Sequence, residues 1–466
     1  MTEALWTWEA LVAASGGQAD RWPDVPITGV SIDSRTLQQG DLFVALKDVR
    51  DGHDFVPAAF AKGASAALVS SGYVRQPGDG PLLRVGDPLA GLQAIARAAR
   101  ARTSAHLVAV TGSVGKTGTK EALRACLSRL GPTHAAEKSY NNHWGVPLTL
   151  ARMPASSAFA VIEIGMNHRG EIAPLAKLAA PHVAIITTVE PVHIGYLGSL
   201  EAIAEEKSDI FVGLAKGGVA IVKRDSPQFP IMRAAAERQG ARVISFGRSP
   251  EADVRLQMIA PEVEGSRITV EALGKGLTYQ VGAPGAHIAE NSLAVVAALL
   301  ALGADVERAL PALADIRPPP GRGARMVLPI GDGELLLIDE SYNANPASVR
   351  AALATLGTVP RIRYPRRIVV LGDMLELGPS SEELHVGLKE AIDAAGVDLV
   401  FACGPNMGRL FATLEPGRQA AWTETSEGLA TPLLGAVRAG DAVMIKGSLG
   451  SRMAPLAEAL KNRFAT

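Results

Sequence analysis

The stretch Leu107-Val-Ala-Val-Thr-Gly-Ser-Val-Gly-Lys-Thr-Gly-Thr-Lys-Glu121 decides the fold of the segments around it. Its apolar start, Leu107 to Val110, is typical of a buried parallel strand, and apolar residues recur with helical spacing after Lys116. A strand, a glycine turn and a helix in this order point backbone N–H groups and a helix N-terminus at a phosphate. The usual motif has four residues between its glycines and this one has two, so an ordinary strand-to-helix turn is the alternative interpretation.

The same turn supplies the groups that a nucleoside triphosphate needs. Lys116 can reach the outer phosphates, and the Thr117 hydroxyl can bind Mg2+. The backbone around the phosphates would come from Gly112, Ser113, Val114, Gly115 and Gly118. We therefore predict that the chain binds a nucleoside triphosphate through this turn.

Composition restricts the class of protein. The 466 residues suffice for three domains of ~100–200 residues each. The formal net charge of -1 argues against nucleic acid as a partner. Cys126 and Cys403 are predicted to be reduced core thiols, because each has apolar neighbours and they lie far apart in the sequence. No stretch reaches the ~18 uncharged apolar residues of a membrane span, and Met1 to Ala14 has no basic run of a signal peptide, so we expect a cytoplasmic protein without a membrane span.

The pattern of apolar runs and the proline- and glycine-rich linker predict three α/β domains. Residues 1–105 alternate short strands with helices and form a small N-terminal α/β domain. Residues 106–314 contain the glycine turn and continuous apolar strands, which predict a central parallel-sheet ATPase domain with an antiparallel excursion at one edge, over 252–282. Residues 315–466 follow the linker Pro318-Pro-Pro-Gly-Arg-Gly323 and predict a doubly wound, Rossmann-like sheet.

The apolar pattern also predicts individual elements in the two larger domains. Strands are expected at 107–110, 160–164, 183–188 and 219–222, and then at 335–339, 368–372, 399–404 and 442–446. Helices are expected at 289–302, 346–356, 381–395 and 453–463.

Polar side chains at strand ends are candidates for a site beside the glycine turn. Glu163 ends an apolar strand at the edge where a Mg2+ ligand would lie, although a lone acid there also serves as a cap or turn former. His193 follows the next strand at the equivalent edge, and a structural role for it stays equally open. Lys207 lies among acids, and i,i+4 pairing on a solvated helix face explains it without any function.

Amide and guanidinium groups form a second set of candidates. Asn141 and Asn142 suit contacts with phosphate or substrate carbonyls, although turns also favour asparagine. Asn291 opens a buried helix, where it could cap the helix or bond a purine edge. Ser34 and Arg35 could hold a diphosphate, because a guanidinium matches phosphate oxygens bidentately, or belong to a surface turn with an exposed ion pair.

Taken together, the motifs of the chain resemble those of the Mur ligases, in the same order and over nearly the whole length. The shared segments are Thr111-Gly-Ser-Val-Gly-Lys-Thr117, Tyr140-Asn-Asn-His-Trp-Gly-Val-Pro147, Glu163-Ile-Gly-Met-Asn-His-Arg-Gly-Glu-Ile172, His193, Lys207, His287 to Asn291, the Gly-Arg after the prolines, Glu340-Ser-Tyr-Asn-Ala-Asn345 and Leu371-Gly-Asp-Met-Leu-Glu-Leu377. The resemblance implies a monomeric, ATP-dependent ligase of peptidoglycan synthesis that adds D-alanyl-D-alanine to UDP-N-acetylmuramoyl-tripeptide. Three alternatives are a diaminopimelate- or lysine-adding relative (whose Asp-Asn-Pro-Arg signature is absent), a folylpolyglutamate-synthase-like ligase and a non-catalytic nucleotide switch.

The resemblance also implies roles for single residues. Lys116 would neutralise the β- and γ-phosphates, while Thr117 and Glu163 hold one Mg2+. His193 and Lys207 would hold a second Mg2+, with Lys207 carbamylated, which replaces the solvated-face interpretation of that lysine. The remaining expected contacts are Asn142 and Asn291 with the nucleotide, Arg322 (or Arg325) and Glu340 with the nucleotide across a cleft, Ser34 and Arg35 with the uridine diphosphate, and Asn141, Tyr342, Asn343, Asn345 and Lys446 with the substrates.

The mechanism that the resemblance implies predicts that the domains move relative to one another. An acyl phosphate must be kept from water until the amine is bound, so the domains are expected to be open without ligands and closed around them.

Overall fold

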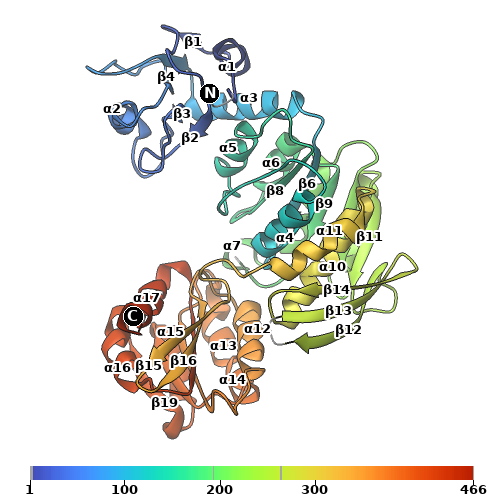
Figure 1. The fold of residues 1–466 in the computed structure, drawn as a ribbon, viewed down its shortest axis with the longest axis vertical. Coiled ribbons are helices and arrows are strands. Elements are labelled where there is room, and N and C mark those ends of the chain that lie inside the picture. Colours follow the sequence, from blue (N-terminus) through green and yellow to red (C-terminus); the bar gives the residue numbers. More distant parts are fainter. Residues whose placement is uncertain (1–3, 193, 263–264, 465–466) are drawn as a thin grey trace.

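The computed structural model describes residues 4–192, 194–262 and 265–464. In these ranges the strands form three separate sheets, each accompanied by helices. Figure 1 shows the central unit between an N-terminal unit and a C-terminal unit that lie apart from each other. The predicted fold class, α/β with three units rich in parallel sheet, is confirmed. None of the helices in the described ranges has the length and apolar character to cross a bilayer.

The N-terminal unit is a five-stranded sheet in the order β1-β5-β4-β3-β2. Its strands are β1 (Gln18–Ala19), β2 (Gly29–Ser31), β3 (Asp41–Val44), β4 (Ala66–Ser70) and β5 (Leu82–Val85), parallel except for β1. Its helices are α1 (Trp8–Ser15), α2 (Val56–Ala61) and α3 (Pro88–Ala101). The Thr7 hydroxyl accepts a hydrogen bond from Ala10 N at 3.2 Å and so caps α1.

The central unit is a nine-stranded sheet in the order β14-β13-β12-β11-β10-β9-β6-β8-β7. Its strands are β6 (His106–Thr111), β7 (Thr133–Ala135), β8 (Phe159–Glu163), β9 (Val183–Ile186), β10 (Val219–Lys223), β11 (Arg242–Gly247), β12 (Val254–Glu262), β13 (Gly265–Ala272) and β14 (Lys275–Val281). Its helices are α4 (Lys116–Ser128), α5 (Gly145–Ala151), α6 (Ile172–Ala179), α7 (Ile194–Leu197), α8 (Leu200–Ser208), α9 (Phe229–Arg238), α10 (Ala286–Ala301) and α11 (Val306–Ala309). The predicted antiparallel excursion is confirmed as β12 to β14, in which β12 itself joins the sheet parallel to β11.

Both faces of the central sheet are covered, and this explains the continuous apolar runs of β6, β8, β9 and β10. Val108 and Val110 pack into the core shared with α4 and α10, whereas Leu107 and Ala109 pack into the core shared with α6 and α9. Successive side chains of a strand point to opposite faces, so residues 107 to 110 of β6, which lie between two helix layers, are all apolar.

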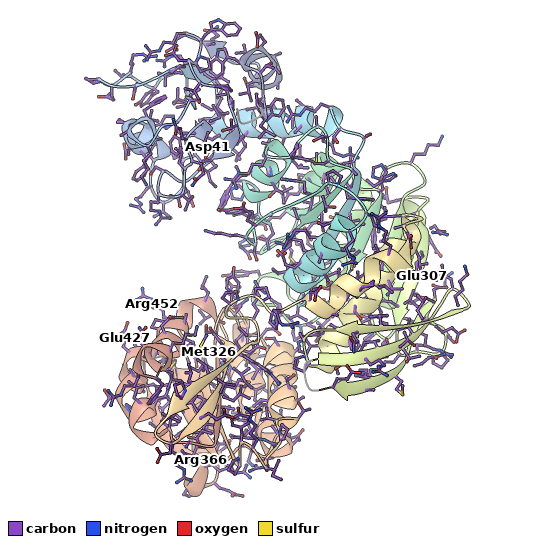
Figure 2. All side chains as sticks on the ribbon, in the orientation of Figure 1. Asp41, Glu307, Met326, Arg366, Glu427 and Arg452 are labelled. Atoms are coloured by element: carbon purple, nitrogen blue, oxygen red, sulfur yellow. The ribbon has the colours of Figure 1, made fainter. Side chains whose placement is uncertain are left out.

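The C-terminal unit is a six-stranded sheet in the order β15-β16-β20-β17-β18-β19. Its strands are β15 (Ala324–Ile330), β16 (Gly333–Glu340), β17 (Arg366–Gly372), β18 (Leu399–Cys403), β19 (Gln419–Thr423) and β20 (Asp441–Lys446), and β15 alone among them pairs antiparallel. Its helices are α12 (Pro346–Gly357), α13 (Ser381–Val386), α14 (Lys389–Ala394), α15 (Pro405–Ala412), α16 (Ala430–Ala436) and α17 (Ala454–Phe464). Arg366, labelled in Figure 2, pairs with the fully buried Asp441 at 2.6 Å and joins the starts of β17 and β20.

The C-terminal unit differs from expectation in one helix and in one strand. The single helix expected at 381–395 is wrong, because the chain turns at Gly387 and Leu388 between α13 and α14. Glycine costs about 1 kcal/mol in a helix interior, and the Gly387 carbonyl accepts a hydrogen bond from Arg350 Nη2 instead. The edge strand β15 was not expected; its apolar residues Met326, Val327, Leu328 and Ile330 are interrupted by Pro329, which within a sheet is typical of an edge strand.

The N-terminal and central units share one hydrophobic core. Leu148 and Ala151 of α5 belong to the apolar cluster of the N-terminal sheet. The Trp6 indole donates to Ala151 O at 2.8 Å, and Arg152 Nε donates to Val30 O at 2.6 Å. These two units are therefore fastened by both apolar packing and hydrogen bonds.

The central and C-terminal units meet more sparsely, at Gly195 and Gly378, at α10 against α12, and at Arg322 against Ser139. A Cβ on Gly195 of α7 would lie 3.0 Å from Gly378 N, and a Cβ on Gly378 would lie 2.9 Å from Gly195 Cα. Gly195 N also donates to Glu376 O, at a long 3.4 Å. Each hydrophobic cluster that the described residues form in the C-terminal unit lies wholly within that unit.

Candidate active site

The glycine turn joins β6 to α4 and is shaped by two residues with positive φ. Gly112 (φ 144°) passes so close to Thr187 that a Cβ would collide with the Thr187 hydroxyl. Gly115 (φ 86°) lies against the Asn291 side chain, whose Nδ2 would be 2.6 Å from a Cβ. In the described chain no side chain caps the first turn of α4, which leaves its N–H groups available to an anion.

The end of β9 holds this turn in place. Ser113 N donates to Thr188 O at 2.9 Å, and Val114 N donates to the Thr188 hydroxyl at 3.2 Å. The Ser113 hydroxyl donates to Glu190 O at 3.0 Å. The turn is thus fixed along its outer side by β9 before any ligand binds.

Glu163 lies across from the turn, because β6 and β8 are parallel and neighbouring, with Val110 in register with Glu163. The carboxylate is buried, accepts a hydrogen bond from the Thr117 hydroxyl at 3.0 Å and accepts another from Asn141 Nδ2 at 2.7 Å. Ser139 Oγ lies 3.1 Å from the same Thr117 oxygen. Hydroxyl and carboxylate oxygens within hydrogen-bond distance are the ligands that Mg2+ prefers, and Mg2+ sites use one or two carboxylates with substrate phosphates.

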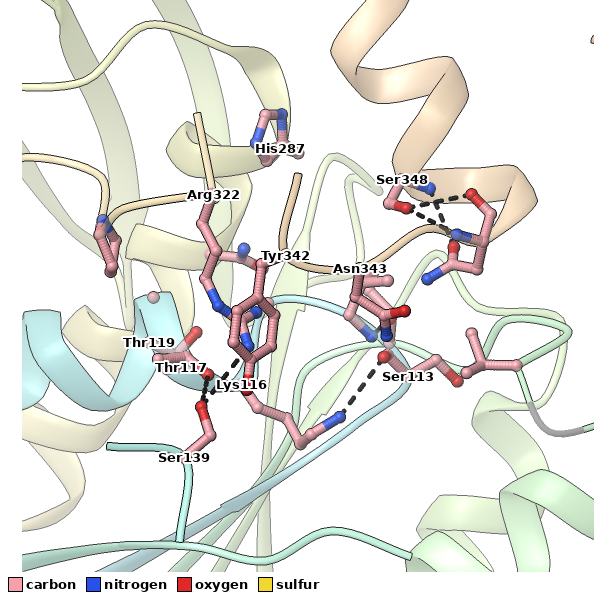
Figure 3. A pocket seen from close by; sticks show the side chains of 18 of the residues that line it. Ser113, Lys116, Thr117, Thr119, Ser139, His287, Arg322, Tyr342, Asn343 and Ser348 are labelled. Atoms are coloured by element: carbon pink, nitrogen blue, oxygen red, sulfur yellow. Dashed lines mark hydrogen bonds between the residues drawn. The ribbon is translucent and has the colours of Figure 1, made fainter. Parts of the chain in front are cut away.

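Lys116 and Arg322 bring positive charge to the same place from two units. Lys116 Nζ donates to Gly112 O at 2.6 Å, and Arg322 Nη2 donates to Ser139 Oγ at 3.5 Å. The pKa of Lys116 is lowered by its burial and by the charge of Arg322, against the opposite effect of Glu163. The Arg322 guanidinium lies 4.0 Å above the Tyr342 ring, so the linker and the C-terminal unit reach over the glycine turn (Figure 3).

The C-terminal wall is organised by Lys446 and Asn345. Lys446 Nζ, buried at the end of β20, donates to Glu340 Oε2 at 3.2 Å and to Asn343 O at 3.0 Å. Asn345 begins α12 through a capping box, in which its Oδ1 accepts from Ser348 N at 2.9 Å and its N–H donates to Ser348 Oγ at 3.0 Å. Both side chains thus have structural partners in addition to the substrate contacts expected from the sequence.

One cavity of about 560 Å³ brings most of the expected residues together. The residues expected at the site that line it are Ser113, Val114, Gly115, Lys116, Thr117, Gly118, Asn141, Asn142, Glu163, Asn291, Arg322, Glu340, Tyr342, Asn343, Asn345 and Lys446. Arg322 lines it, whereas the competing Arg325 lies exposed on β15, opposite Ile338. The cavity therefore lies between the central and C-terminal units and has walls from both.

The other candidates lie elsewhere. Arg35 is 80% exposed in the N-terminal unit, where it pairs with Asp33 at 2.8 Å and lowers the pKa of that carboxyl to about 2. Ser34 is half-buried beside it. Gly112 shapes the turn from behind the cavity wall, and His193 lies outside the described residues.

Lys207 is buried at the end of α8, close enough to Lys116 for their charges to interact. Burial and repulsion from Lys116 lower its pKa well below the ordinary value, against the attraction of Glu206. The expectation of a solvated helix face, drawn from the residue pattern alone, is therefore wrong, because a lysine at 3% exposure is not solvated. Among the residues that the structure describes, no cluster of three His, Cys, Asp or Glu side chains could hold a metal alone.

Ser139 and Lys223 are among the cavity residues that were not identified from the sequence. Ser139 contacts both Thr117 and Arg322, and its only signal was its place just before the asparagine pair. Lys223 ends β10 and pairs with Glu290 of α10 at 2.6 Å, so a charged residue at the carboxyl end of a parallel strand was the available signal.

Comparison with known families matches all three units. The model described as "Mur ligase family, catalytic domain" matches residues 26–99, "Mur ligase middle domain" matches 110–299, and "Mur ligase, glutamate ligase domain" matches 325–449. The matched segments follow the three sheets of the structure in order.

Individual relatives cover nearly the whole chain. The chain is 35% identical to the UDP-N-acetylmuramoyl-tripeptide--D-alanyl-D-alanine ligase of Escherichia coli (strain K12), over 94% of each chain. The crystal structure of MurF from Acinetobacter baumannii is 30% identical and superposes with a TM-score of 0.84, covering 99% of this chain and 100% of that one. MurF ligase from Thermotoga maritima in complex with ADP is 26% identical, with a TM-score of 0.77 over 93% and 98% of the two chains. The chain belongs to the Mur ligase family.

Proposed function

We propose that the chain uses ATP to join the carboxylate of UDP-N-acetylmuramoyl-tripeptide to the amino group of D-alanyl-D-alanine, giving ADP, phosphate and the pentapeptide precursor of peptidoglycan. The observation that supports this most directly is the cavity in which the glycine turn, Glu163 and the C-terminal wall meet. Relatives that carry this activity in their names match more than nine-tenths of the chain, and one relative was crystallised with ADP.

The reaction needs an activated carboxylate, because its oxide is a poor leaving group. An oxygen of the peptide carboxylate attacks the γ-phosphorus of ATP, the bond to the β-phosphate oxygen breaks, and an acyl phosphate and ADP form. The amine then attacks the acyl carbon, loses a proton, and inorganic phosphate leaves. Lys116 and the first N–H groups of α4 stabilise the negative charge on the transferring group, and Arg322 adds charge from the opposite wall.

Mg2+ would be held by Thr117 and Glu163, whose oxygens lie 3.0 Å apart in the cavity wall. When bound, it supplies a Lewis acid that offsets charge on the phosphate oxygens. Asn141 and Ser139 orient these two ligands by hydrogen bonds. For a second Mg2+ we propose His193 and a carbamylated Lys207, because burial lowers the pKa of this lysine and so increases the fraction of free amine, the form that reacts with CO2.

The three units divide the substrates among them in this proposal. Residues 1–105 would hold the uridine diphosphate through Ser34 and Arg35, 106–314 would hold ATP, and 315–466 would hold the dipeptide. Asn291, against the glycine turn, would contact adenine, and Asn142 and Glu340 would complete the nucleotide site. Tyr342, Asn343, Asn345 and Lys446 would face the dipeptide. Because the proposed reaction consumes ATP, we propose a cytoplasmic location.

The test is a phosphate-release assay with ATP, Mg2+ and UDP-N-acetylmuramoyl-tripeptide. D-alanyl-D-alanine, diaminopimelate and glutamate are offered separately as amines. We expect phosphate release with D-alanyl-D-alanine and not with the other two amines, and we expect Lys116→Met to abolish this release. Release only with diaminopimelate or glutamate would replace the proposed amine, and release with none would contradict the ligase.

A further inference from the structure

Lys120 lies one turn into α4, and its side chain has no exposed surface. Its Nζ donates to Ala136 O at 2.6 Å and to Lys138 O at 3.5 Å, and it lies 2.8 Å from Glu121 Oε1. These three acceptors match the three N–H groups of an ammonium. Burying an unpaired charge costs several kcal/mol, so this pairing is a requirement of the position.

Two of the acceptors belong to the loop from 136 to 142, between β7 and α5. The same loop supplies Ser139, which contacts Thr117 and Arg322, and Asn141, which contacts Glu163. Tyr140 N donates back to Lys138 O at 2.8 Å, so the carbonyl that Lys120 contacts also shapes the turn before the asparagine pair. Among the described side chains of α4, Lys120 thus contacts the start of this loop, at Ala136 and Lys138, and Thr117 contacts its middle, at Ser139.

We propose that Lys120 is a positioning residue, which holds the loop 136–142 against the glycine turn and thereby sets the geometry of Thr117, Ser139, Asn141 and Glu163 for Mg·ATP. The inference rests on the proposed function for its kinetic consequences, but its structural part stands on the contacts alone. A packing role would not require a charge, because a buried ion pair can usually be replaced by apolar residues of similar volume without loss of stability. The ammonium is needed here because carbonyl oxygens are its partners.

The experiment compares Lys120→Met with Arg124→Met. Arg124 lies on the same helix, is half exposed and contacts the same Glu121 carboxylate at 2.8 Å, but it makes no described contact with the loop. Lys120→Met is expected to lower kcat/KM for ATP by about 10- to 100-fold, as the loss of an outer support usually does. The KM for D-alanyl-D-alanine should change by less than about twofold, since that wall lies on the other unit. Arg124→Met should leave both constants close to those of the unmodified protein, and Lys120→Arg should recover part of the loss.

Two measurements do not depend on catalysis. Hydrogen–deuterium exchange of the backbone over 136–142 should be faster in Lys120→Met than in Arg124→Met, and ADP affinity by calorimetry should fall by about tenfold or more. An unchanged KM for ATP with unchanged exchange would overturn the positioning role. So would equal losses for all substrates, which would indicate general destabilisation.

The design separates this inference from the proposed function. If the unmodified protein releases no phosphate with any amine, the proposed function fails, while exchange and ADP binding still decide the role of Lys120. If Lys120→Met does not fold, Lys120→Gln, which keeps a donor but loses the charge, is compared with Arg124→Met by the same measurements and the same criteria.

Discussion

Lys207 shows that the role predicted for a side chain depends on whether that side chain is buried. On sequence alone it resembles any lysine among acids, yet it is buried near Lys116 with its pKa lowered well below the ordinary value. Lys207→Ala is expected to abolish phosphate release, because the proposed second metal loses its carboxylate-like ligand. Short-chain carboxylic acids added to the assay should restore part of the activity. Equal activity of the variant and the unmodified protein would remove the second-metal role.

The two thiols give a prediction for alkaline pH. Burial raises the pKa of the Cys126 thiol from 9.0 to about 12 and that of Cys403 to about 11. Between pH 9 and about 11 the unfolded thiols ionise while the folded ones keep their protons, so the free energy of unfolding must fall as the pH rises through this window. Below pH 9 this contribution is complete. Denaturant midpoints from pH 8 to 11 measure it, and Cys126→Ala should show a smaller decline.

Accessibility gives a direct check on the same thiols. Neither should react with iodoacetamide at pH 8 while the protein is folded, and both should react once it is unfolded. Rapid labelling of either cysteine in the folded protein would show that its burial is not maintained in solution.

Residue identity predicts chemistry better than it predicts partners. The pattern around Lys116, Thr117 and Glu163 sufficed to predict that they lie together, because strand order brings them to one edge of the sheet. The pattern did not show what Lys120 and Lys446 contact, because their carbonyl partners, Ala136 O and Asn343 O, lie 16 and 103 residues away in the sequence. Asp373 is similar, because its carboxylate accepts from Met407 N at 2.7 Å and caps α15 from a different strand.

At the scale of elements, α12 offers a test of a site residue that is also a cap. Asn345→Ala removes the acceptor for Ser348 N and should lower the free energy of unfolding by about 1 kcal/mol, which denaturant titration measures. Asn345→Asp keeps a good capping oxygen and should retain stability. If Asn345→Asp is stable but inactive, the amide is needed by the substrate; if both variants keep activity, the expected dipeptide contact is absent.

Elements with strong periodicity could be predicted, and marginal ones could not. The strands buried on both faces, such as β6 and β17, appear in the sequence as continuous apolar runs, and their positions agree with expectation within one or two residues. Strands such as β7 and β19 have no fully buried residue and are defined by their neighbours in the sheet, so their own residues carry little signal. The split between α13 and α14 depends on one glycine within an otherwise helical pattern.

At the scale of the whole molecule, the two interfaces between the three units predict which unit moves. The N-terminal and central units share a hydrophobic cluster, whereas the central and C-terminal units meet at Gly195 and Gly378, at α10 against α12, and at the linker residues around Arg322. Ligand-driven closure should therefore displace the C-terminal unit relative to the other two. X-ray scattering with and without ADP and UDP-substrate should show compaction, and a distance between spin labels on α1 and α9 should stay constant while one between α9 and α16 shortens. Constant scattering would contradict closure.

The lining of the cavity contains no residue from the N-terminal unit among those described, although its Arg35 is the expected diphosphate ligand. A substrate whose diphosphate binds Arg35 and whose carboxylate reaches the γ-phosphate beside Lys116 must span the distance between the N-terminal and central units, which are held together by a shared cluster. The fixed distance between these two sites then selects the substrate by its length. A substrate with one amino acid fewer, or without its nucleotide, would bind at one site and fail to reach the other. This selection would follow from the spacing of the two units and would not require a pocket that recognises the side chains of the substrate peptide.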